Sequence, residues 1–166
     1  VDLSAPNQIT INATSGLSAV TTSGSDTTGV YFENFYGTSI GSGLVETLIS
    51  GDLTNAENPA DFSPNLFRGS GSDPGLNLWS WSSDSTVTFT AGSLAFTGSA
   101  TWAVSATEYA EMLAGNTSGN LYFPADTEDD IAGGAMLLGT WQVIPEPASL
   151  SLLGLGLAFG LRRNRG

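Results

Sequence analysis

Short apolar stretches alternate with turn-forming residues along the first 144 residues of this 166-residue chain. The apolar stretches follow one another about every 8–12 residues, and Gly, Ser, Thr, Asn and Asp fill the gaps between them. This spacing is typical of β-sandwiches and barrels, whereas alternating strands and helices need longer periods. We therefore predict an all-β fold, an antiparallel β-sandwich of the jelly-roll-like kind with one short helix.

The pattern predicts strands at residues 8–13, 29–36, 44–50, 76–82, 85–91, 94–96, 101–105, 121–123 and 136–143. The first of these alternates polar and apolar residues and places Ile9 and Ile11 on one face. The segments between residues 76 and 105 follow one another closely, and we expect them to form an antiparallel meander. Residues 51–75 are rich in Asn, Pro, Asp, Ser and Gly, so we expect a long irregular loop that contains Arg68.

One helix is predicted after the strand at 101–105. Ser105 and Glu108 have the spacing of a capping box, in which the two residues satisfy each other's free backbone amides. Gly115 stands where a helix commonly ends. Three apolar residues share the face that the helix would bury against one end of the sandwich: Tyr109, Met112 and Leu113.

The last 24 residues have a different pattern. The triplet Pro145, Glu146 and Pro147 precedes an uncharged apolar run at 148–161. The run has 14 residues, which as a helix is about 21 Å. A usual membrane span has about 20 residues, so this run is short for one. Three arginines follow the run at the C-terminus and favour the cytoplasmic side of a membrane: Arg162, Arg163 and Arg165.

We therefore divide the chain into an extracellular domain at 1–142 and a C-terminal segment at 143–166 with a short transmembrane helix. The alternative is that the apolar run forms a buried helix of a soluble domain. That alternative is disfavoured because the run is apolar on every face and ends in a strongly basic terminus. The chain begins at Val1 without a basic and apolar leader, so we expect a mature form or a fragment.

The C-terminal segment resembles the PEP-CTERM sorting signal. V-I-P-E-P-A-S-L-S-L-L-G-L-G-L followed by R-R-N-R contains the Pro-Glu-Pro triplet, the short Leu/Gly/Ala-rich helix and the terminal Arg cluster in the family's order. The resemblance implies recognition by an exosortase, a membrane cysteine transpeptidase that cuts near the triplet. Pro145, Glu146 and Pro147 would then be recognition residues for that enzyme. The resemblance says nothing of the preceding domain, because sorting signals are attached to unrelated folds.

The domain is strongly acidic. The whole chain has 16 Asp and Glu, four Arg, no Lys and a net charge of −12. Outside the C-terminal segment Arg68 is the only base. Nucleic acid is excluded as a partner because phosphate binding needs clustered Lys and Arg. Such a surface is soluble and self-repelling, which suits an extracellular protein.

Composition also limits the chemistry. The chain has neither His nor Cys, so Ser-His-Asp and Cys-His catalysis and His-based zinc sites are excluded. A carboxylate pair of the glycosidase kind stays open, but no spacing selects one. We expect no enzyme and no required cofactor.

One acidic cluster has the oxygen ligands that Ca²⁺ prefers. Its members are Asp126, Glu128, Asp129 and Asp130. The pattern departs from an EF-hand loop, because Ile131 stands where that loop needs Gly. A solvated turn is the favoured alternative to a calcium site.

Three tryptophans are candidate glycan contacts, since exposed aromatic rings on a sheet stack on sugars: Trp79, Trp81 and Trp102. In the segment 76–82, alternation places Trp79 and Trp81 on one face with Asn77, and leucines on the other. Either face can be the core. Packing in the core is the more frequent fate of Trp in a small domain, and we favour it.

The sequence thus predicts an exported bacterial protein of the cell envelope, cell surface or extracellular matrix, without catalytic activity. Its partners are expected to be an exosortase, the inner membrane before processing, and exopolysaccharide, with which the resemblance associates the family. The alternative is a glycan-binding, lectin-like module assisted by calcium.

Overall fold

Short strands dominate the fold. The computed structural model describes residues 1–37, 46–55, 64–69, 73–79 and 86–144. These residues form β1 (Gln8–Asn12), β2 (Thr22–Ser25), β3 (Val30–Phe32), β4 (Glu46–Thr54), β5 (Asn65–Phe67), β6 (Leu76–Trp79), β7 (Thr86–Phe89), β8 (Thr97–Val104), α1 (Ala106–Ala114), β9 (Ser118–Phe123), α2 (Glu128–Gly133) and β10 (Met136–Gln142).

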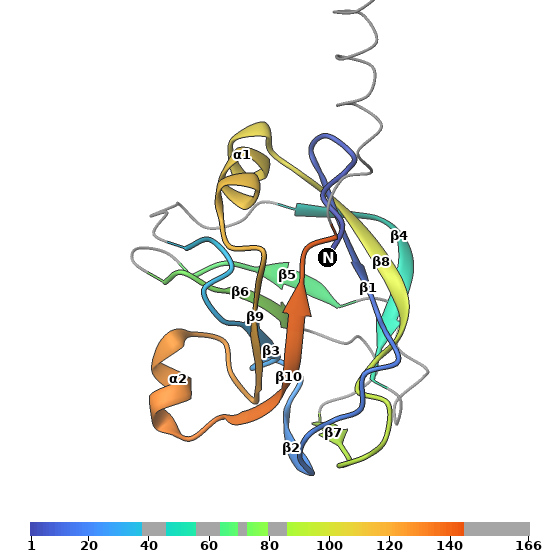
Figure 1. The fold of residues 1–166 in the computed structure, drawn as a ribbon, viewed down its shortest axis with the longest axis vertical. Coiled ribbons are helices and arrows are strands. Elements are labelled where there is room, and N and C mark those ends of the chain that lie inside the picture. The colour runs from blue at the N-terminus through green and yellow to red at the C-terminus, as the bar shows by residue number, and fades with distance from the viewer. Residues whose placement is uncertain (38–45, 56–63, 70–72, 80–85, 145–166) are drawn as a thin grey trace, which may run out of the picture.

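The strands make three antiparallel sheets (Figure 1). One has the order β1-β8-β4, the second has the order β10-β9-β3-β6-β5, and the third is the pair β2-β7. The prediction of an all-β fold is confirmed, while the jelly-roll-like arrangement stays a prediction.

The core lies between the three-stranded and five-stranded sheets. Strand alternation sends Ile9 and Trp102 inward from the first sheet and Phe32 and Leu78 inward from the second, and all four are buried. Phe89 of β7 adds its ring beside Phe123, with centroids 4.8 Å apart. The aromatic residues therefore supply much of the buried apolar surface.

The outer face of the five-stranded sheet is also partly covered. Tyr31 and Asn77 point to this face and are almost fully buried. The Asn77 amide donates hydrogen bonds of 2.7 Å to the carbonyls of Thr28 and Ala125. The chain from Ala125 to α2 thus lies over this face, which explains why β6 is buried on both sides.

Two predictions about the middle of the chain are wrong. Residues 51–75 are not one loop, because β4 runs on to Thr54 and β5 lies within the segment. The meander is also absent, since β6, β7 and β8 belong to three different sheets. Of the predicted strand at 94–96, the structure has a single bridge from Leu94 to Leu17.

The predicted helix is confirmed as α1, together with its capping box. The Glu108 amide donates to the Ser105 hydroxyl, and the Ser105 amide donates to the Glu108 carboxylate, both at 3.2 Å. Met112 is buried, but Leu113 is 54% exposed, so the buried stripe is narrower than predicted. The final predicted strand is confirmed as β10.

Candidate functional site at the end of β10

Backbone hydrogen bonds hold β10 and the two residues after it, up to Ile144. The Val143 amide donates to the Thr117 carbonyl at 2.8 Å, continuing the ladder between β10 and β9. The Ile144 amide donates to the Val1 carbonyl, and the Val1 amino group donates to the Gln142 carbonyl, both at 2.7 Å. Pro145, the first residue of the triplet, therefore directly follows Ile144, a residue held by a backbone hydrogen bond to Val1.

Residues 1–3 hold Ile144 in place because they bridge the three-stranded and the five-stranded sheets. Asp2 exchanges backbone hydrogen bonds of 2.7 and 2.9 Å with Thr10 of β1. Asp2 also makes a parallel bridge to Ile144, which follows β10. The side chains of Val1 and Leu3 are buried on either side of Asp2. Figure 1 shows the N-terminus next to the end of β10. Val1 and Asp2 thus hold the chain at Ile144, directly before the Pro-Glu-Pro triplet.

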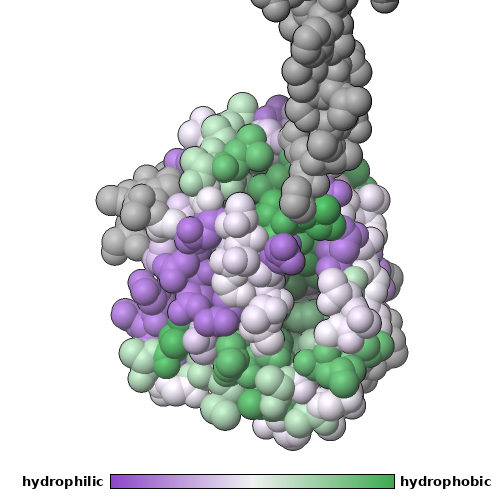
Figure 2. Space-filling model, viewed as in Figure 1, coloured by the Kyte–Doolittle hydropathy of each residue, from purple (hydrophilic) through white to green (hydrophobic). Residues whose placement is uncertain are grey.

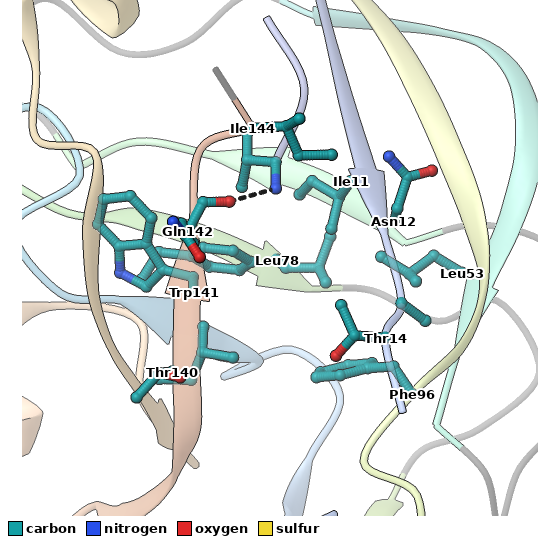
Figure 3. A pocket seen from close by; sticks show the side chains of 14 residues that line it. Ile11, Asn12, Thr14, Leu53, Leu78, Phe96, Thr140, Trp141, Gln142 and Ile144 are labelled. Atoms are coloured by element: carbon teal, nitrogen blue, oxygen red, sulfur yellow. Dashed lines mark hydrogen bonds between the residues drawn. The ribbon is translucent and has the colours of Figure 1, made fainter. Parts of the chain in front are cut away.

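A cavity of about 450 Å³ opens beside these residues, between β1 and β10. Ile11 and Leu53 lie on one side and Trp141 on the other, with Leu78 between them (Figure 3). Polar residues stand at the rim: Asn12, Thr14, Thr140 and Gln142. Figure 2 shows hydrophobic residues at the bottom of a narrow hollow on this face. The two sheets therefore leave part of their core reachable from outside.

The sorting residues of the prediction lie outside the described residues. This holds for Pro145, Glu146 and Pro147, for the apolar run, and for Arg162, Arg163 and Arg165. Within the described part of the chain, no helix has the length and apolar character to cross a membrane.

The three candidate tryptophans have different surroundings. Trp102 is fully buried in the core, so its proposed role as a glycan contact is corrected. Trp79 is half-buried and packs edge-to-face against Phe67, with centroids 6.2 Å apart. Trp81 lies outside the described residues.

The acidic cluster forms the start of α2. The Asp130 carboxylate accepts hydrogen bonds from the amides of Asp126 and Thr127, at 2.9 and 3.2 Å. Burial and the hydrogen bond with Asp130 raise the pKa of Asp126 to about 6, whereas the backbone hydrogen bonds lower the pKa of Asp130.

Glu128 and Asp129 of the same cluster point to solvent. Among the described residues, no group of three or more Asp or Glu is arranged to hold a metal ion. The geometry therefore gives the predicted calcium site no support and assigns Asp130 to helix capping.

The comparisons with known proteins identify the C-terminal segment. Residues 143–165 match the PEP-CTERM protein-sorting motif. The motif indicates an exported protein that an exosortase recognises at the cell envelope. It begins at Val143, which lies between Gln142 and Ile144, the two residues whose backbone bonds to Val1. No curated protein and no solved structure matches the chain, so the domain is assigned to no family.

Sequence reasoning found the PEP-CTERM motif but missed the bridge and the cavity. One signal for the bridge was present, because Val1, Asp2 and Leu3 alternate apolar and polar as a strand does. The cavity had no local signal, since its walls come from residues more than 100 positions apart.

Proposed function

We propose that this protein is exported, held in the inner membrane by the segment 148–161, and cut by an exosortase at or near the Pro-Glu-Pro triplet. The domain then acts at the cell surface or in the extracellular matrix, close to exopolysaccharide, without catalysing a reaction. Before cleavage the three terminal arginines lie on the cytoplasmic side.

One observation carries this proposal. Val143 and Ile144, the first two residues of the PEP-CTERM motif, are still held by backbone hydrogen bonds to Thr117 and Val1. Cleavage on the C-terminal side of Ile144 leaves every described hydrogen bond of β10 in place. A cut at the triplet therefore releases the domain without unfolding it.

The test is the intact mass of the protein from exosortase-containing bacteria and from the same strain without the enzyme. We expect the first to lack the residues after the triplet and the second to retain them. Glu146→Ala should reduce the cleaved fraction, whereas Glu128→Ala, an exposed acid on α2, should leave it unchanged. Equal masses from both strains would contradict the proposal.

The non-catalytic role is supported by composition. Without His and Cys the usual nucleophilic catalysts cannot be built. The strong negative charge favours a dispersed, soluble domain outside the cell. Hydrolysis of a panel of polysaccharides and esters by the purified chain would contradict this part of the proposal.

Glycan binding is the second candidate, and one observation favours it. Phe67 is 40% exposed and packs against the half-buried Trp79, so two aromatic rings meet on the outer face of the five-stranded sheet. Such rings can stack on sugars. A glycan array should show ligands that Phe67→Ala and Trp79→Ala both weaken, with Leu137→Ala as a control on another exposed apolar side chain.

A further inference from the structure

Two aromatic rings form a corner on the outer face of the five-stranded sheet. Asn65 of β5 pairs with Trp79 of β6, and Phe67 lies two residues further along β5. The rings of Phe67 and Trp79 meet at 70° with their centroids 6.2 Å apart, and Phe67 is 40% exposed. Asn65 is also exposed, and strand alternation places it on the same face as Phe67. The corner thus combines an apolar surface with an amide at its side.

A carboxylate stands on the same face, beyond Phe67. Gly69 follows Phe67 by two residues, and a Cβ added at Gly69 would lie 3.0 Å from the Cβ of Asp73. The Asp73 carboxylate accepts a hydrogen bond from the hydroxyl of Tyr31, whose side chain points to this face. Two residues of a strand span about 7 Å. A ligand that lies on the ring of Phe67 is therefore close to Asp73.

Further carboxylates lie near Asp73. Burial, the hydrogen bond with Asp130 and the charges of Asp130 and Asp73 raise the pKa of Asp126 to about 6. Asp73 and Asp126 are therefore close enough for the charge of one to act on the other. Together these carboxylates create a negative potential beside the aromatic corner.

No base on the described surface offsets this potential. Arg68 is the only Lys, Arg or His among the described residues, and it is fully buried in an ion pair with Glu111. The charged side chains on the surface of the described residues are therefore acidic. They repel ligands that carry carboxylate or sulfate groups and attract ligands that carry an ammonium group. Among glycans, this charge disfavours uronates and favours amino sugars.

The rings and the carboxylates together narrow the choice further. An aromatic corner alone would accept neutral sugars, and carboxylates alone would accept any cation. In an amino sugar the nitrogen is bonded directly to the ring, so a ring on Phe67 brings its ammonium to the side of Asp73. Acetylation of the nitrogen removes the charge and with it this attraction.

We propose that the corner formed by Phe67 and Trp79 binds amino sugars whose amino groups are free and protonated, as in a polymer of glucosamine. The apolar face of one sugar ring stacks on Phe67 and touches Trp79, its ammonium lies toward Asp73, and its hydroxyls bond with the Asn65 amide. This inference rests on the glycan binding given above as the second candidate function, and it specifies the class of glycan.

Calorimetry on the full 166-residue chain in nanodiscs of zwitterionic lipid tests the class of ligand. The probes are hexasaccharides of glucosamine, of N-acetylglucosamine and of glucuronate, at a pH at which the free amino groups are protonated. The glucosamine probe should bind at least about tenfold more tightly than its acetylated form, and the glucuronate probe should not bind. This preference should shrink at about 0.5 M salt, because exposed charges are then screened.

Two variants separate the rings from the charge. Phe67→Ala should weaken binding of the glucosamine probe at least about fivefold, because it removes the stacking surface. Asp73→Asn keeps an acceptor for the Tyr31 hydroxyl, and it should weaken the glucosamine probe at least about threefold without changing the acetylated one. Asp52→Asn makes the same change in net charge on β4 of the other large sheet and should leave the preference unchanged.

Hydrogen exchange locates the site without any variant. The bound glucosamine probe should slow exchange in the peptides that contain Asn65–Phe67 and Leu76–Trp79 and leave β10 unaffected. Protection of other segments alone would place the sugar elsewhere and overturn the proposal.

The remaining outcomes distinguish this proposal from glycan binding in general. Equal affinity for the free and the acetylated probe, with both weakened by Phe67→Ala, would overturn the amino-sugar class but support glycan binding. No binding of any hexasaccharide would contradict both. Spermine is the control for charge without a sugar ring. Binding of spermine as tight as that of the glucosamine probe, with neither changed by Phe67→Ala, would show attraction of cations only and overturn the proposal.

Discussion

At the scale of single residues, the most unusual position is Arg68. It is the only base outside the sorting segment, and it is fully buried. Its guanidinium lies 3.6 Å from the ring centroid of Tyr36 and makes an ion pair with Glu111 of α1. A buried charge is tolerated only when it is paired, so Arg68 fastens α1 to the end of β5. Burial of Tyr36 raises the pKa of its hydroxyl, which therefore stays neutral.

Glu111→Gln should lower the free energy of unfolding by about 2 kcal/mol, because it leaves the buried guanidinium without this carboxylate. The loss is smaller than for a fully buried pair, since Glu111 is 24% exposed. Urea unfolding measures it. Glu128→Gln, an exposed substitution of the same kind, is the control and should have little effect. Equal stabilities of the two variants would show that the ion pair contributes nothing.

Asp126 makes stability depend on pH. Its pKa is raised from 3.8 to about 6, so the folded state binds a proton that the unfolded state has already released. Stability from this group is therefore lost as pH rises from about 4 to 6. Asp126→Asn removes the charge and keeps a donor for Asp130. It should raise the thermal midpoint at pH 7.5, with a difference from wild type that shrinks toward pH 4. A difference independent of pH would contradict this assignment.

At the scale of elements, α1 shows what a local signal can predict. The capping box acts over three residues, so the sequence alone placed Ser105 and Glu108 correctly. Strand pairing is set by contacts between distant segments, and the predicted meander failed for that reason. β6 pairs with β3 and β5, whereas β8 pairs with β1 and β4. The loop assigned around Arg68 failed because β5 has only three residues and too little pattern to detect.

Ser105→Ala should lower the free energy of unfolding by about 1 kcal/mol, because the amide of Glu108 loses its acceptor at the start of α1. Thr107→Ala lies in the same first turn, is exposed, and should be neutral or slightly stabilising. Guanidinium unfolding of both variants gives the comparison. If the two changes are equal, the cap has no role in stability.

At the scale of the whole molecule, residues far apart in the sequence, Val1 and Ile144, lie together. Val1 and Asp2 lie between Thr10 of β1 and the end of β10, so they join the two larger sheets. The sorting motif could be predicted from sequence because its parts are contiguous. The cavity between β1 and β10 could not, because it exists only once the fold brings Asn12 and Thr140 to the same face.

Asp2→Pro should lower the thermal midpoint and speed hydrogen exchange at Ile144, because proline removes the amide that Asp2 donates to Thr10. Asp2→Asn keeps every backbone hydrogen bond and serves as the matched control. We expect it to retain the exchange rate of the parent chain. Fast exchange at Ile144 in both variants would show that the side chain, and not the backbone bridge, holds this end.

The position of Ile144 also decides how the domain bears a mechanical load. If the C-terminal segment anchors the chain, as proposed, the load reaches the described residues at Ile144, the end of the chain that continues β10. The hydrogen bonds between β10 and β9 lie across the direction of β10, from Met136 to Gln142. Tension therefore shears this ladder as a whole instead of opening it one bond at a time. On the proposal that the C-terminal segment anchors the chain until an exosortase cuts it, this geometry resists drag before cleavage and has no such role afterwards.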